Sequence, residues 1–227
     1  MRNIVRRLVF FFLMIPATAV ALELPWPGTD LEGRPCSGTR NDTFGYDYTD
    51  EHLKKEHKYK MVVNAHFKPE VENLTDNNLW GNLNYTLNAS PNHHRALWAM
   101  IRLQLRYEQR QEGRNVLQLP GYWRHIPAPE CYLNRAVLFS PKDATLHVLQ
   151  GIYLHKRDLL DPALQAYQQA IKKGLDTAEL HYNLGLLYVD LGDIAAAERH
   201  AEKAYSQGYP TPGLQRKIQR MKSDRDT

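Results

Sequence analysis

The sequence predicts an all-α fold: an α-solenoid of stacked helical hairpins with an irregular N-terminal arm and a C-terminal capping helix. The first observation is a 34-residue period that relates Gly151 to Gly185. The second is the recurrence of apolar residues at steps of three and four in residues 96–105, as on one face of a helix. The third is the density of Pro and Gly in residues 22–45, which disfavours regular structure there. The same period links Ala136, Ala170 and Ala204, and also Ala163 and Ala197. Each hairpin leaves an apolar face bare unless a neighbour covers it, so this architecture favours binding over catalysis.

Residues 1–21 are predicted to be a cleavable secretory signal peptide. The segment carries Arg2, Arg6 and Arg7 without an acid, then an apolar run over residues 8–15 and the small residues Ala19-Val20-Ala21. The apolar run is too short to cross a bilayer, which takes roughly 20 residues. We therefore expect no stable membrane insertion after cleavage, with an uncleaved anchor as the alternative. The expected location is outside the cytoplasm, in the periplasm of a Gram-negative bacterium.

Removal of this segment nearly neutralises the chain. The full sequence has 29 Lys and Arg against 25 Asp and Glu, and residues 1–21 contain three of the basic residues and none of the acids. The remainder thus has 26 basic and 25 acidic residues, a net charge of +1. Nucleic-acid binding usually requires a concentrated basic face, so we expect no nucleic-acid partner.

Two cysteines, Cys36 and Cys131, remain in the processed chain. Export would place them where disulfides persist, and an even number invites pairing. The bridge would join the Pro/Gly-rich arm to the first well-formed repeat. Two separate buried thiols are the alternative. The absence of a C-x-x-C motif gives no support to redox exchange.

Residues 22–68 are expected to form an extended arm that packs along the helices, because Trp26, Phe44, Tyr46 and Tyr48 have little reason to lie in a free tail. Within it, apolar and polar residues alternate over residues 58–68. This period of two favours a short strand. A helix through the same segment stays open, since the sequence shows no partner strand.

Residues 69–143 are predicted to be degenerate helical repeats. Pro69 suits the first turn of a helix, and Pro91 separates two further helical segments. A second helix is expected to begin near Ala128 and to end before Pro141. The distance from Pro91 to Pro141 is 50 residues, 16 more than one period, which predicts an insertion near residues 107–128.

Residues 144–209 resemble two consecutive tetratricopeptide repeats. The second repeat carries Leu184, Gly185, Tyr188, Ala197 and Ala204 at positions of the family pattern, and the first carries Gly151, Ala163, Tyr167 and Ala170. The resemblance implies that the glycines let the two helices of a hairpin approach closely and that the alanines let the next hairpin stack. It covers about residues 77–222 and weakens toward the N-terminus. Residues 210–222 are then expected to be a capping helix, with Leu214, Ile218 and Met221 on one face and Arg216, Lys217, Arg220 and Lys222 on others. Its basic face is interpreted as a solvated cap, with contact to anionic lipid as the alternative.

The resemblance also implies a binding surface. In this family the first helix of each hairpin lines a concave groove that holds a peptide or a partner's helix. By phase, the groove residues here are Arg95, Trp98, Arg102, Arg106, Val148, Ile152, His155, Tyr182, Leu186 and Asp190, with Lys156 beside them. Trp98, Arg102 and Tyr182 lead these candidates because Trp, Tyr and Arg are enriched at binding hot spots, although Trp98 also suits a core position. The family's two-cation clamp for C-terminal carboxylates is not expected, since Val148, Ile152 and Leu186 occupy groove positions.

The predicted insertion contains a second candidate site, the adjacent residues Tyr122, Trp123, Arg124 and His125. Side chains of these types on a loop suit a recognition element. They equally suit a plug in which Trp123 packs against the helices. Both interpretations stay open.

Catalysis and metal binding have little support. His93 and His94 are adjacent, and His52 and His57 are five residues apart, so neither pair presents two ligands on one helical face. The sequence contains no H-E-x-x-H, no G-x-S-x-G and no phosphate-binding glycine loop. We therefore expect a non-enzymatic protein without cofactor or metal. The first hypothesis is a periplasmic adaptor or scaffold that binds another protein during envelope assembly. The alternatives are a permanent structural subunit of an envelope complex and, less favoured, a metal-binding protein or enzyme.

Overall fold

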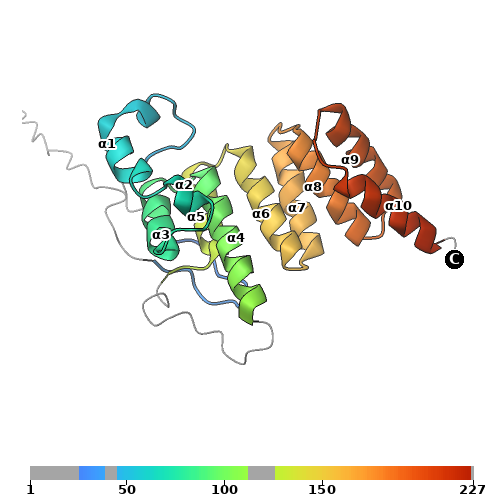
Figure 1. Ribbon diagram of the computed structural model, residues 1–227, viewed down its shortest axis with the longest axis horizontal. Helices are drawn as coiled ribbons and strands as arrows, with labels where there is room; N and C mark the ends of the chain where they lie inside the picture. Colours follow the sequence, from blue (N-terminus) through green and yellow to red (C-terminus); the bar gives the residue numbers. More distant parts are fainter. Residues whose placement is uncertain (1–25, 39–44, 112–125, 226–227) are drawn as a thin grey trace, which may run out of the picture.

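The computed structural model describes residues 26–38, 45–111 and 126–225 (Figure 1). Within these ranges the chain is all-helical and forms no strand, apart from an isolated bridge between Thr29 and Pro35. The helices lie side by side in a row along the long axis of the molecule, as a solenoid requires. The all-α prediction is confirmed.

The chain first forms short helical segments: η1 (Leu53–Lys55), α1 (His57–Tyr59), η2 (Lys60–Asn64) and α2 (Pro69–Glu72). Longer helices follow: α3 (Leu79–Ala89), α4 (His94–Gln111), α5 (Pro129–Phe139), α6 (Ala144–Lys156), α7 (Leu160–Lys172), α8 (Ala178–Asp190), α9 (Ile194–Ser206) and α10 (Gly213–Arg225). Helices α6 and α7 form one hairpin and α8 and α9 the next, and α10 packs against both helices of the second hairpin. The two predicted repeats and the capping helix are thus present.

Local sequence signals begin and end the helices. The Asp143 side chain accepts a hydrogen bond from the Thr145 backbone N–H at the start of α6 (3.1 Å), and Asp193 accepts one from the Ala196 N–H at the start of α9 (2.9 Å). These bonds satisfy donors that have no partner inside the helix. Between the two helices of each hairpin the backbone turns through a left-handed residue, which is Gly192 (φ 78°) in the second hairpin and Asp158 (φ 59°) in the first. The left-handed backbone conformation of the turn therefore recurs after 34 residues, although the residue changes from Asp to Gly.

The strand considered for residues 58–68 does not form, because the segment is helical from residue 57 to residue 64. Tyr59 and Val63, four residues apart, are both buried and share a small cluster with Tyr46 and Ala89. The rings of Tyr46 and Tyr59 meet edge to face with centroids 5.4 Å apart. Residues four apart lie on the same side of a helix, so the contact with the arm and the end of α3 selects the helical alternative.

Small residues let the hairpins pack closely, but the two glycines do so against different partners. A Cβ atom added at Gly151 would lie 2.5 Å from the ring of Tyr167 on α7, the second helix of the same hairpin. At Gly185 the added atom would instead meet the side chain of Leu214 on α10. The nearest contact is thus within the hairpin for Gly151 and with the capping helix for Gly185. Ala201 on α9 stands one period after Tyr167, so the second hairpin carries a methyl group where the first carries the ring.

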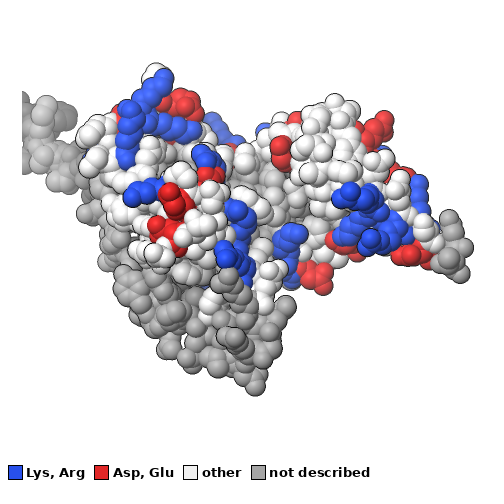
Figure 2. All heavy atoms as spheres, in the orientation of Figure 1, with Lys and Arg blue, Asp and Glu red and all other residues white. Residues whose placement is uncertain are grey.

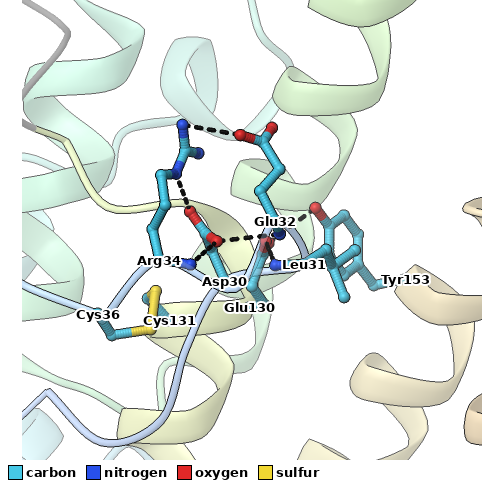
Figure 3. Close-up of a disulfide and its surroundings, with 8 residues drawn as sticks. All are labelled: Asp30, Leu31, Glu32, Arg34, Cys36, Glu130, Cys131 and Tyr153. Atoms are coloured by element: carbon cyan, nitrogen blue, oxygen red, sulfur yellow. Dashed lines mark hydrogen bonds and ion pairs between the residues drawn. A yellow bond between two sulfur atoms is a disulfide. The ribbon is translucent and has the colours of Figure 1, made fainter.

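The arm is fastened to α5. A disulfide joins Cys36 to Cys131, the pair that the sequence favoured (Figure 3). Beside it the Glu130 carboxylate accepts a hydrogen bond from the Leu31 backbone N–H (2.7 Å) and another from the Tyr153 hydroxyl of α6 (2.9 Å). One carboxylate thus links the arm, α5 and the first tetratricopeptide-like hairpin.

Trp26 and Tyr46 also hold the arm, against α5 and the end of α3. The ring of Trp26 meets Tyr132 edge to face, and the guanidinium of buried Arg135 lies 4.7 Å from the Trp26 ring centroid. Burial lowers the pKa of Arg135 to about 10. Farther along, the Tyr46 backbone N–H donates to the carbonyl of Ala89 at the end of α3 (3.0 Å). These contacts place the described part of the arm against α5 and the end of α3, and none of them involves α8 or α10.

Candidate functional site

The first helices of successive units, α4, α6, α8 and α10, line one side of the solenoid, here called the first-helix face (Figure 1). The sequence placed ten candidate binding residues on α4, α6 and α8. The structure gives these three helices different neighbours. The role of the ten residues in binding a partner stays a prediction.

On α4 the three arginine candidates hold another segment of the same chain. The Arg95 guanidinium forms a bidentate ion pair with the Glu72 carboxylate. Arg102 donates to the carbonyl oxygen of Glu72, and Arg106 donates to that of Leu74 (3.2 Å). The last carbonyls of a helix have no partner within it, and α2 ends at Glu72, so Arg102 satisfies a carbonyl that α2 leaves free. Residues 69–74 therefore cover this part of the face.

Trp98 lies between these arginines and is partly buried against the main core cluster. The guanidinium of Arg102 sits 5.8 Å from the Trp98 ring centroid. Both its neighbours along this helix edge, Arg95 and Arg102, are engaged by residues 69–74. The position suits the core interpretation of Trp98 better than that of an exposed hot spot.

The central part of the face, on α6 and α8, carries the apolar candidates Val148, Ile152 and Leu186. Ile152 and Leu186 are half-buried, whereas Val148 is buried. Tyr182 stacks on Tyr209, with ring centroids 3.9 Å apart, and packs against the third core cluster. Ile152 packs partly against the second core cluster and Leu186 against the third, and each keeps part of its surface exposed.

Ion pairs cross the face between neighbouring first helices. His155 Nε2 lies 2.9 Å from Asp190 Oδ2, and Lys217 Nζ of α10 lies 2.6 Å from Asp190 Oδ1. Arg157, just after α6, pairs with Glu108 of α4. Burial alone would raise the pKa of Asp190, but the hydrogen bonds from Lys217 and His155 outweigh it and the pKa is lowered. Asp190 is thus a neutralised link between helices and adds little negative charge to the face.

Basic side chains gather on the face, as Figure 2 shows over α4 and α10. Lys156, Arg216 and Arg220 are exposed, and within residues 26–38, 45–111 and 126–225 none of them has an ion-pair partner. The basic character of α10 was noted from the sequence. The pairing of Asp190 was not, because it depends on the angle between neighbouring hairpins.

The histidines that the structure describes do not gather into a metal-ligand cluster. No group of three potential His, Cys, Asp or Glu ligands occurs in the part of the chain that the structure describes. Burial lowers the pKa of His93 to about 3, and its Nδ1 accepts from the Ala96 backbone N–H (3.2 Å). The adjacent His94, the first residue of α4, contacts Asp143 at the start of α6 (2.5 Å). Each of the two therefore has a structural contact of its own.

A second histidine cluster, which the sequence did not reveal, joins the helices of the last hairpin. His181 of α8 contacts Asp176 through Nε2 and His200 of α9 through Nδ1, with 2.9 Å between the two Nδ1 atoms. Burial, with the nearby His181 second, lowers the pKa of His200 to about 4. Two imidazole nitrogens at this distance share one proton, so the contact requires at least one unprotonated nitrogen.

Two predicted features lie outside the described residues: the signal peptide at residues 1–21 and the loop residues Tyr122, Trp123, Arg124 and His125. Among the described helices, none has the length and apolar character needed to span a membrane.

Comparison with known proteins agrees with this architecture. Residues 154–192, from the end of α6 through α8, match the family model of the TPR repeat. No curated protein matches the chain. The match and the stacked hairpins together support a tetratricopeptide repeat protein, and the fold is a TPR-like helical solenoid.

Proposed function

We propose that this protein is a protein–protein interaction adaptor whose first-helix face holds a segment of another protein. The observation that carries the proposal is the half-buried floor of Ile152 and Leu186 on adjacent first helices, next to cations without acidic partners. A partly exposed apolar strip with a polar rim is typical of a docking surface for a peptide or helix. Repeats of this class commonly bind other proteins, which supports the same conclusion.

We further propose that the adaptor acts in the periplasm of a Gram-negative bacterium during envelope assembly. The disulfide between Cys36 and Cys131 supports an oxidising compartment. The basic and apolar beginning of the sequence supports export. The adaptor is proposed to act without cofactor or metal.

The test is affinity capture from envelope extract with the chain lacking residues 1–21. The variant Ile152→Asn with Leu186→Asn removes the apolar floor without adding charge. Its matched control, Gln168→Asn with Ala195→Asn, changes exposed positions on the second helices α7 and α9. Circular dichroism and thermal unfolding establish that both variants fold.

A partner identified by mass spectrometry should bind the wild type and the control, and should be lost from the floor variant. Binding should then be reproduced with the two purified proteins. Equal capture by all three forms would refute the first-helix face as the docking surface. Trp98 and Tyr182 are poorer probes, because their replacement would disturb contacts within the chain.

A further inference from the structure

The first-helix face already holds one piece of polypeptide, the chain's own segment 69–76, with the sequence PEVENLTD. Val71 and Leu74 are buried in the core cluster that also includes Leu97 of α4. On the rim, Arg95 holds the carboxylate of Glu72, as described above. The segment combines apolar side chains that insert toward the helix with an acidic side chain and carbonyls that arginines hold. This is the chemistry that the α4 part of the face selects.

The next part of the face offers the same combination without an occupant from the described chain. Ile152 and Leu186 supply the half-buried apolar surface. Lys156 lies one helical turn after Ile152 on α6. On α10, Lys217 bridges to Asp190 of α8, and Arg220 lies three residues after Lys217. The acid between them, Asp190, is already held by His155 and Lys217.

Cations without acidic partners beside an apolar floor favour a negatively charged occupant. Repulsion between exposed like charges raises the free energy of the isolated protein slightly, and an acidic ligand removes this repulsion. Burial of the ligand's apolar side chains on the floor also favours binding. Figure 2 shows basic side chains over α10 with acidic ones beside them, and the exposed cations of α6 and α10 without an ion-pair partner among the described residues are Lys156, Arg216 and Arg220.

We propose that the partner segment is an acidic peptide with interspersed apolar residues. It docks on α6, α8 and α10 with its apolar side chains on Ile152 and Leu186 and its carboxylates at Lys156 and Arg220. The proposal rests on the proposed adaptor function and specifies the chemistry of the partner. Segment 69–76 limits the site on the α4 side, because it occupies the adjoining surface.

The probe for this proposal is a fluorescently labelled peptide with the sequence of residues 69–76, which carries three acids. The control peptide replaces them with Gln, Gln and Asn and keeps the apolar residues. Binding to the full chain without residues 1–21 is followed by fluorescence anisotropy at low and at physiological salt. The expected result is saturable binding of the acidic peptide, at least fivefold tighter than that of the neutral peptide and weakened by salt.

Protein variants locate the peptide. Lys156→Glu with Arg220→Glu should weaken binding at least fivefold. Lys172→Glu with Arg199→Glu makes the same change of charge at exposed positions on the second helices and should leave affinity unchanged. Because all these residues are exposed, folding should survive in both variants, and circular dichroism checks this.

The proposal would be overturned by no saturable binding of the acidic peptide, by equal binding of the neutral peptide, or by equal effects of the two double variants. Loss of binding in Arg95→Glu but not in the Lys156/Arg220 variant would place the peptide on α4 and would also overturn it. A partner whose capture requires Ile152 and Leu186, together with failure of the acidic peptide, would overturn only the acidic chemistry. The adaptor function would then stand.

Discussion

Alanine at Gly151 and at Gly185 tests whether the 34-residue glycine period reflects close packing. A Cβ at Gly151 would lie 2.5 and 2.6 Å from two ring carbons of Tyr167, which is fully buried and held by the core. Overpacking of this kind costs about 1–3 kcal/mol, whereas replacing a mid-helix Gly by Ala gains about 1 kcal/mol in helix propensity. Because the contact is this short and the ring is held by the core, the steric cost lies at the upper end of that range, about 2–3 kcal/mol, and the expected net loss of unfolding free energy for Gly151→Ala is about 1–2 kcal/mol.

Gly185→Ala is the matched control. Its nearest neighbour is a terminal methyl of Leu214, on the capping helix at the end of the solenoid. A Leu side chain can change rotamer and α10 can shift slightly, so the steric cost should roughly cancel the propensity gain, leaving a change within about 0.5 kcal/mol of zero. The two variants should therefore differ by about 1–2 kcal/mol although the chemical change is the same.

The assay is chemical denaturation followed by far-ultraviolet circular dichroism. A third background, Tyr167→Leu, removes the ring that Gly151→Ala would strike. In that background the alanine should become neutral or stabilising, so a double-mutant cycle should show a coupling of about 1 kcal/mol or more. Wild-type stability or better for Gly151→Ala alone, or an identical loss in both backgrounds, would refute the packing explanation of the glycine.

Three further predictions concern stability. Cys36→Ser with Cys131→Ser opens a loop of 95 residues. Chain entropy predicts that the free energy of unfolding falls by about 4–5 kcal/mol, which urea denaturation of the oxidised protein and of the variant would measure. A loss below about 1 kcal/mol would contradict this prediction. Asp158→Gly relieves a left-handed backbone (φ 59°) and should raise the thermal midpoint, equivalent to about 0.5–1 kcal/mol, whereas a lower midpoint would contradict this prediction. Burial lowers the pKa of His93 to about 3 and that of His200 to about 4, so the unfolded chain binds more protons below pH 6.5 and stability should fall as the pH drops toward 4. The slope is about 1.4 kcal/mol per pH unit for His93 and smaller for the half-exposed His200, and equal denaturation midpoints at pH 7 and pH 5 would rule it out.

The helices from α3 onward were predictable because their signals are local. The 34-residue period, the prolines between helices and the capping residues act within one or two helical turns, and α6 to α9 begin and end where these signals lie. The alternation in residues 58–68 was ambiguous because a local pattern alone did not decide between strand and helix. It contained a helical pair, Tyr59 and Val63, whose use depended on Tyr46 and Ala89 elsewhere in the chain.

The contacts of the candidate residues were not predictable from the repeat phase. The repeat phase assigned Arg95, Arg102 and Arg106 to the first-helix face, which stays a prediction. It could not show that residues 69–74 cover them, since this depends on the path of the chain after α2, where Leu74 adopts a left-handed backbone (φ 60°).

The sequence by itself determined the stacked hairpins, because helix spacing and small packing residues recur every 34 residues and each unit folds mainly on its neighbours. It also supplied the two cysteines, but left their pairing open. Only the tertiary structure decided that Cys36 meets Cys131, that Glu130 reaches Leu31 across 99 residues, and that residues 72 and 74 contact the arginines of α4. Such contacts join residues far apart in the chain, and a pattern that repeats locally carries no information about the path that brings them together.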